Sequence, residues 1–334
     1  MIKYILALIL FIIFNISNAQ IYDFKNIDFT RADNIAKLNK GENLQNLALL
    51  SYKLTSKLPT KVEKFRAIYT WVSTNISSDI KQQNKIFRIQ KKFKNDSIAF
   101  IKWNEEYKKK VFKKLLKDNK TMCTGYAYII KELAFLADIE CEIVDGYGRT
   151  VESNIDSLET TNHSWNAVKL NGKWYLCDAT WSSGYVNENY NFIEDYNDGY
   201  FLTTPILFAK NHYPIQKKWL LNNVTTNITF TTSPLVYGET FKYKIVNLTP
   251  SKMNVEVKKN EEISFNFKAL KDIPLDKISL IFYLGDKELP FNIYDIKSEK
   301  GIIKFKNKFK WKGFYDVHLK IKNDIVATYS IKVS

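Results

Sequence analysis

Residues 121–140 read TMCTGYAYIIKELAFLADIE, and residues 162–181 read NHSWNAVKLNGKWYLCDATW. In the first stretch apolar residues recur at helical spacing from Ala127 to Ala137, which predicts an amphipathic helix with Cys123 at its start. Unpaired amides and the positive dipole end at a helix N-terminus favour the thiolate, the nucleophilic form of cysteine. The alternative for a single cysteine is a small buried core residue.

The second stretch has the pattern of a β-hairpin. Asn-Gly at 171–172, between two alternating runs, predicts a two-residue turn whose register places Trp165 opposite Asp178 and His163 opposite Thr180. Because side chains alternate along a strand, all four share one face. At this register His163 and Asp178 are diagonal neighbours about 7–8 Å apart at the backbone, close enough for a hydrogen bond between imidazole and carboxylate.

These residues have the chemistry of a thiol acyl-transfer site. Cys123 is the predicted nucleophile, His163 the general base and acid, and Asp178 the group that orients the imidazole. The backbone N–H of Cys123 is one expected oxyanion donor, whereas the pattern identifies no second one. Trp165 is a candidate for the lining of the cleft, with plain packing as its alternative.

The same strings resemble a known family. CTGYA at 123–127, NHSWNAV at 162–168 and NGKWYLCDATW at 171–181 are similar to the transglutaminase-like superfamily. FLTTPILF and NHYPIQKKWLL, further along, resemble its kyphoscoliosis peptidase branch. The resemblance covers roughly 59–221, and it implies a papain-like fold with a triad at Cys123, His163 and Asp178.

Two features depart from the family pattern. Asp138 stands where the family often has glycine, and a long basic segment precedes Cys123. Neither changes a triad residue, so they bear on substrate access rather than on the chemistry.

The composition predicts a globular protein of two domains. The chain has 334 residues, of which 45% are hydrophobic and 25% charged. We expect an α+β fold, with a transglutaminase-like catalytic domain of helices and antiparallel sheet at 20–222 and an immunoglobulin-like β-sandwich at 223–334. Thr60 and Glu63 form a capping-box pattern before helical spacing that continues to Ile76.

The C-terminal part is read as strands because its periodicity is mostly two. Alternating runs separated by turn residues indicate the β-sandwich: FKYKIV, MNVEV, ISFNF, ISLIFYL, GIIKF, FYDVHLKIK and IVATYSIKV. These runs contain no residues that predict chemistry.

The first 19 residues have the pattern of a cleaved signal peptide. Lys3 precedes an apolar run, and small residues stand before Gln20. The alternative is an uncleaved anchor, although the run is shorter than the roughly 20 residues of a membrane-spanning helix. We therefore expect a secreted, periplasmic or cell-surface protein with no stable membrane span after cleavage.

The cysteine count leaves at least one thiol free. A Cys141–Cys177 disulfide would suit an oxidising compartment and leave Cys123 free. Two buried thiols explain the same residues.

Segment 81–120 carries most of the positive charge. It contains fourteen Lys or Arg and four Asp or Glu, a net charge of +10 out of +15 for the whole chain. Its helical pattern around 98–116 interleaves aromatic residues with lysines, so contact with an anionic surface is one interpretation. A solvated face of a docked helix is the other.

Other ligand classes find little support. The three histidines, His163, His212 and His318, show no paired metal-ligand spacing, so we expect no metal and no cofactor. His212 and His318 are interpreted as structural. Nucleic-acid binding has no supporting motif.

Three functions remain open for a protein or peptide substrate. The first is a secreted cysteine peptidase, in which water resolves the thioester. The second is a transglutaminase, in which an amine resolves it. The third is a non-catalytic binding module on the same fold, because fold alone does not establish function.

Overall fold

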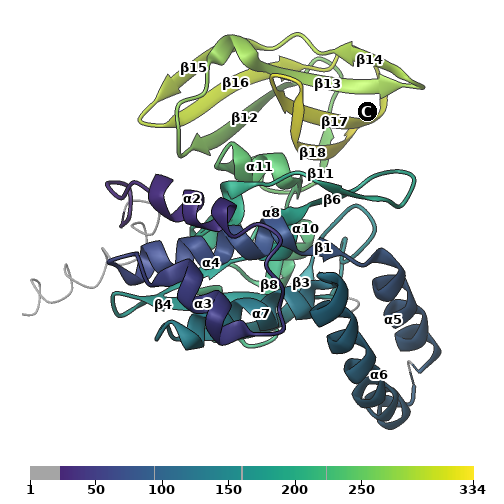
Figure 1. The fold of residues 1–334 in the computed structure, drawn as a ribbon. Helices are drawn as coiled ribbons and strands as arrows, with labels where there is room; N and C mark the ends of the chain where they lie inside the picture. Colours follow the sequence, from purple (N-terminus) through teal and green to yellow (C-terminus); the bar gives the residue numbers. More distant parts are fainter. Residues whose placement is uncertain (1–22, 94, 159–160, 223) are drawn as a thin grey trace, which may run out of the picture.

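A computed structural model describes residues 23–334 except 94, 159–160 and 223, so the expected signal peptide lies outside the described residues. The described chain has a body of helices and sheet, followed by two further sheets stacked against it (Figure 1). This arrangement confirms the predicted α+β class. No helix in the described part combines the length and apolar composition that crossing a membrane requires.

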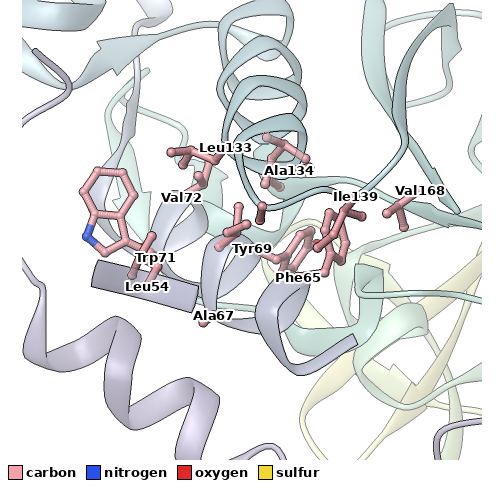
Figure 2. Packing of buried hydrophobic residues seen from close by; sticks show 14 of the residues in the cluster. Leu54, Phe65, Ala67, Tyr69, Trp71, Val72, Leu133, Ala134, Ile139 and Val168 are labelled. Carbon is pink, nitrogen blue, oxygen red and sulfur yellow. The ribbon is translucent and has the colours of Figure 1, made fainter. Parts of the chain in front are cut away.

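A helical layer surrounds the first core. Its helices are α2 (Thr30–Leu38), α3 (Leu47–Thr55), α4 (Lys61–Asn75) and α7 (Cys123–Leu136). Helix α4 begins at the predicted capping box, in which Thr60 and Glu63 each bond the other's backbone N–H. Phe65, Trp71 and Leu133 are fully buried in this core (Figure 2).

An antiparallel sheet of four strands packs against this layer. Its order is β5-β4-β3-β8, with bounds Lys173–Cys177, His163–Leu170, Cys141–Gly148 and His212–Pro214. Asn171 and Gly172 form the predicted hairpin turn, with φ of 51° and 79°. Val168 pairs with Tyr175, as the register predicts.

The hairpin is shorter than predicted. Strand β5 ends at Cys177, and Thr180 lies in the short helix α8 (Ala179–Ser183), so the expected pairing of His163 with Thr180 is wrong. Asp178 ends the strand because its side chain accepts the backbone N–H groups of Thr180 and Trp181, as an N-cap does.

The two faces of this sheet are both covered. Val168, Tyr175 and Cys177 lie in the core shared with α4 and α7. Trp165 and Leu176 lie in a second core, which includes Leu207 and Phe208 of α9 (Pro205–Phe208) and Phe241 of α11 (Gly238–Lys242). The end of the sheet at which β4 starts therefore lies between two apolar layers.

Between α8 and the C-terminal sheets the chain forms short elements. A small hairpin of β6 (Gly184–Val186) and β7 (Phe192–Glu194) is followed by the 3₁₀ helix η1 (Asp198–Tyr200). The 3₁₀ helix η2 (Lys217–Leu220), helix α10 (Asn227–Thr232) and strand β9 (Leu235–Val236) follow β8.

The C-terminal sheets form the predicted β-sandwich. One has the order β10-β12-β16-β15, and the other β11-β18-β17-β13-β14 with β9 also paired to β18. The bounds are Ile245–Thr249 (β10), Asn254–Val257 (β11), Glu262–Ala269 (β12), Ile278–Leu284 (β13), Lys287–Pro290 (β14), Tyr294–Glu299 (β15), Ile302–Lys308 (β16), Gly313–Ile321 (β17) and Asp324–Val333 (β18). Phe265, Phe305 and Tyr329 pack between the sheets.

One predicted strand begins later than expected. The first residues of FKYKIV close helix α11, and β10 starts only at Ile245. Phe241 is fully buried, and helical backbone aims it into the second core beside Tyr200.

The basic segment forms a helical hairpin. Helices α5 (Ile80–Lys92) and α6 (Ser97–Asp118) extend away from the body (Figure 1). Strands β1 (Ser77–Ser78) and β2 (Lys120–Thr121) pair in parallel and close the base of the hairpin. The second strand leads directly into Cys123.

Candidate active site

Cys123 occupies the predicted position, as the first residue of α7. The first backbone bonds of this helix run from Gly125 and Tyr126 to the carbonyl of Met122, so the amides of Cys123 and Thr124 precede the ladder. Gly125 allows β2 to pass close to the helix, because an added Cβ would lie 2.0 Å from Thr121 Oγ1.

His163 and Asp178 form the predicted pair. His163 Nε2 lies 2.7 Å from Asp178 Oδ2, and both side chains are buried. His163 is the first residue of β4 and Asp178 the first beyond β5, so the hairpin register brings them together. The carboxylate can therefore fix the orientation of the imidazole.

The thiol completes the group. Burial by itself lowers the pKa of His163, but the charge and hydrogen bond of Asp178, together with the hydrogen bond and charge of Cys123, outweigh it and raise the pKa to about 10. Because Nε2 faces the carboxylate, Nδ1 is the nitrogen left for the sulfur. The imidazole can thus take the proton of the thiol and hold it as an imidazolium.

A second contact joins α7 to β4 next to Cys123 and His163. Thr124 Oγ1 lies 3.4 Å from Ser164 Oγ, which donates to Asp145 Oδ1 at 2.7 Å. Residues next to the thiol and next to the imidazole are therefore linked directly. This contact restricts how far the helix start can move from the strand.

The Asp178 carboxylate has all its acceptor directions used. Oδ1 accepts from the amides of Thr180 and Trp181, at 2.8 and 3.3 Å. Oδ2 contacts His163 and also His212 Nε2, at 3.1 Å. Burial by itself raises the pKa of Asp178. The two imidazoles lower that pKa by more than burial raises it, so the pKa of Asp178 lies well below its usual value. Asp178 is therefore ionised and rigidly held.

His212 is a member of the site that sequence reasoning missed, since it was interpreted only as structural. It lies on β8, fully enclosed, and burial lowers its pKa to about 4, so it is neutral at pH 7. A neutral imidazole has one N–H, and the carboxylate can only accept, so Nε2 carries the hydrogen. Nδ1 then needs a donor, whereas the atom 2.7 Å from it is Oδ1 of Asn211, which can only accept. A half-turn of that amide presents its nitrogen to Nδ1 and its oxygen to the hydroxyl of Tyr200.

Aromatic rings enclose the pair. Trp181 stacks on His163 with ring centroids 4.4 Å apart and an angle of 18° between the planes. Trp165, expected as a cleft residue, lies buried with its ring 6.0 Å from His163 and 4.9 Å from His212. Phe208 stacks on His212 at 3.9 Å. These rings keep water from the carboxylate, which strengthens its interaction with the imidazoles.

The same side chains also have the composition of a metal site. One ligand atom each from His163, Asp178 and His212 lie within 4.8 Å of one another. Both imidazole nitrogens, however, contact the same carboxylate oxygen at hydrogen-bond distances. Hydrogen bonding between the three groups accounts for their positions without an ion.

The other two cysteines differ from Cys123. All three thiols are free, so the possible Cys141–Cys177 disulfide does not form. Burial raises the pKa of both Cys141 and Cys177, which keeps them as protonated core thiols. Among the cysteines only Cys123 contacts a base.

Comparison with known proteins identifies a family over the part of the chain that holds these residues. Residues 49–179, which include the thiol, the imidazole and the carboxylate, match the family described as the Transglutaminase-like superfamily. The chain contains a transglutaminase-like core. The resemblance inferred from the sequence is thereby confirmed.

Two curated relatives extend the comparison of this transglutaminase-like chain. The human protein named Kyphoscoliosis peptidase is 33% identical over 173 residues, which cover 50% of this chain and 23% of that protein. Hillarin of Drosophila melanogaster is 24% identical over 243 residues, covering 68% of this chain and 27% of that protein. The aligned part thus spans about a quarter of the length of either relative.

Comparison with solved structures adds one further similarity. The Lin-41 filamin domain covers 27% of the chain and 91% of its own length, with 7% identity and a TM-score of 0.22.

Proposed function

We propose that the protein is a cysteine peptidase that cleaves peptide or protein amides through Cys123, His163 and Asp178. The observation that carries the proposal is the 2.7 Å contact between His163 and Asp178, with the other nitrogen of His163 left for the thiol at the start of α7. The similarity to proteins named peptidases supports it.

The geometry allows a balanced two-step reaction. The thiolate of Cys123 adds to the amide carbonyl, and the imidazolium of His163 gives its proton to the leaving amine as the C–N bond breaks. His163 then removes a proton from water, which attacks the thioester and releases the acid and the thiol. Asp178 stabilises the charged imidazole in both steps.

The open amide at the helix start has a role in both steps. The backbone N–H of Cys123 is positioned to donate to the oxyanion, and the loss of one such donor costs on the order of 3 kcal/mol in comparable sites. Trp181 and Trp165 limit water around the His163–Asp178 pair.

Site-directed labelling tests the nucleophile. A peptide aldehyde or vinyl sulfone, mapped by mass spectrometry, is expected to modify Cys123 in the wild-type protein and nothing in Cys123→Ala. Cys141→Ala is the matched control, because burial raises the pKa of that thiol and keeps it protonated, and this variant should label normally at Cys123. Labelling at Cys141 or Cys177 alone would overturn the assignment.

A separate experiment tests whether water or an amine accepts the acyl group from the thioester. Incubation with a glutamine peptide and a tagged amine gives tagged product only if an amine resolves the thioester, as in a transglutaminase. We expect cleaved peptide and no tagged product. Neither product, with a folded and unlabelled protein, would indicate a non-catalytic binding module.

We also propose export of the mature protein, on the pattern of the first 19 residues. N-terminal sequencing of the protein recovered from its native cell is expected to begin at Gln20. A mature chain that still begins at Met1 would contradict export with cleavage.

A further inference from the structure

A pocket of about 310 Å³ lies at the base of the α5–α6 hairpin, outside the triad. Four lysines line it: Lys81, Lys85, Lys110 and Lys114. The remaining lining residues are Asp79, Gln82, Tyr107 and Val111. The single carboxylate among these eight leaves the pocket with an excess of three positive charges.

The positive charge of the pocket is largely uncompensated. Asp79 is already committed, since Oδ1 accepts the amide of Gln82 at 3.1 Å and Oδ2 pairs with Lys114. Within the described part of the chain Lys81, Lys85 and Lys110 form no ion pair with a carboxylate. The ammonium of Lys85 instead lies 4.5 Å from the ring centroid of Tyr107. Close like charges without counterions favour an anionic ligand.

A buried polar atom adds an independent requirement. Gln82 is 5% exposed, and its Oε1 has no hydrogen-bond partner among the described residues. An acceptor left unpaired in this way is costly, and a ligand that brings an N–H group would satisfy it. Peptides with acidic side chains supply both groups, because their backbone donates and their carboxylates meet the lysines.

The pocket adjoins the chain that carries the nucleophile. The backbone N–H of Asp79 donates to the carbonyl of Thr121 at 2.7 Å, and Thr121 precedes Cys123 by two residues. Ser78 pairs with the same residue in the parallel β1–β2 ladder. The base of the hairpin and the nucleophile are therefore joined by one short, buried connection.

We propose that this pocket is a subsite for acidic residues of the polypeptide substrate. The proposal rests on the proposed peptidase function, whose site it supplements. The volume of the lysine-lined pocket is at the low end for ligand pockets. This volume suits one or two side chains rather than a folded partner. Substrates with Glu or Asp near the scissile amide bind more tightly than neutral ones, and the preference weakens as salt is added.

Binding is measured first in the Cys123→Ala protein, so that turnover plays no part. The probe is a fluorescein-labelled hexaglutamate peptide, followed by anisotropy at low and high salt, with hexaglutamine as the neutral probe. Lys85→Glu with Lys110→Glu is expected to weaken hexaglutamate binding at least tenfold. The matched control, Lys91→Glu with Lys92→Glu, makes the same charge change on α5 outside the pocket lining and should alter affinity less than threefold.

The outcomes separate the alternatives. Equal losses in the two double variants would overturn the subsite, because only the overall charge of the hairpin would matter. The protein could instead bind phosphatidylserine vesicles more strongly than hexaglutamate and lose that vesicle binding in the Lys85→Glu, Lys110→Glu variant. This result would overturn the peptide subsite in favour of a lipid surface. Equal affinity of the Cys123→Ala protein, with all four lysines in place, for hexaglutamate and hexaglutamine would also overturn the subsite.

A kinetic measurement then tests the role in turnover. In the active protein the Lys85→Glu, Lys110→Glu variant is expected to raise KM for an acidic peptide about tenfold and to leave kcat and the rate with a neutral peptide unchanged. A fall in kcat with both peptides would contradict the proposal. Failure of the proposed peptidase is recognised independently, since Cys123 would then remain unlabelled while hexaglutamate still binds.

Discussion

The imidazole of His163 lies between a carboxylate and a thiol, and this position determines its charge. Its pKa is raised to about 10, so it stays protonated across neutral pH. Asp178, whose pKa is lowered, stays ionised throughout this range. At the scale of single residues the site therefore holds a charged imidazole between the Asp178 carboxylate and the Cys123 thiol.

The pH dependence follows from this pair. The folded pKa of His163 exceeds its ordinary value, so its contribution to stability is complete below about pH 6.5 and is lost as the pH rises through about 10. We expect kcat/KM to decline over the same alkaline range, which gives the pH profile an alkaline limb near pH 10. A limb near pH 7 in the wild-type profile would contradict the assignment.

Removal of the Asp178 charge tests the cause of the raised pKa. Asp178→Asn is expected to shift the alkaline limb toward neutral pH, because the favourable charge interaction with His163 is lost. Loss of the orienting acceptor should also lower kcat roughly a thousand- to ten-thousand-fold. The measurement is the pH profile of both proteins on one substrate. An unshifted limb would show that the carboxylate does not control the titration.

His212 is expected to act through Asp178. In His212→Phe the ring can still stack on Phe208, but the donor to Asp178 Oδ2 is gone. Loss of a comparable supporting contact lowers activity about 10- to 100-fold, and we expect this in kcat with KM unchanged. His212→Gln keeps an N–H donor and should lose less. Equal losses in both variants, or a change confined to KM, would argue against this positioning role.

At the scale of elements, the start of α7 depends on how closely β2 approaches it. A Cβ on residue 125 would lie 2.0 Å from Oγ1 of Thr121, whose side chain is fully buried and cannot swing aside. This close approach fixes where the helix begins, and so it fixes the position of Cys123 relative to β4. The same β1–β2 ladder anchors the lysine-lined pocket.

Gly125→Ala is expected to lower the free energy of unfolding by about 1–3 kcal/mol, the usual cost of overpacking a core. Urea denaturation measures it. Thr121→Ala removes the two nearest of the clashing atoms, so the double variant should be more stable than the sum of the two single changes predicts. Additive effects would indicate that the helix start tolerates the extra methyl group.

At the scale of the whole molecule, the transglutaminase-like body and the β-sandwich share a core. Phe241 stacks on Tyr200 with centroids 4.2 Å apart, and the carbonyl of Tyr200 accepts the amide of Asp178. Lys210, between α9 and β8, donates to the carbonyl of Asn247 in β10, and Tyr237 bonds Thr328 of β18. The sandwich therefore supports the residues that pack behind His163 and Asp178.

This shared core predicts a single unfolding transition. Phe241→Ala removes a fully buried ring and should destabilise the protein by about 3–5 kcal/mol, with one lowered transition in calorimetry and loss of activity at the same temperature. Leu284→Ala, at an exposed site of the sandwich, is the control and should change little. Two separate transitions, of which only one shifts, would show that the parts fold independently.

The sequence by itself determined the local elements of the site. The helix that starts at Cys123, the Asn-Gly turn and the register of β4 against β5 follow from periodicity and turn chemistry, which act between near neighbours. The His163–Asp178 pair is a consequence of that register. The pattern could not show that β5 stops at Cys177, because the stop comes from Asp178 capping a helix rather than from the alternation.

Only the tertiary structure decided which distant residues join the site. His212 lies 34 positions from Asp178 and enters through the pairing of β8 with β3, so no local spacing indicates it. Trp181 meets His163 only because the chain turns into α8. Contacts of this kind depend on how layers pack, whereas sequence periodicity records only which face of an element is apolar.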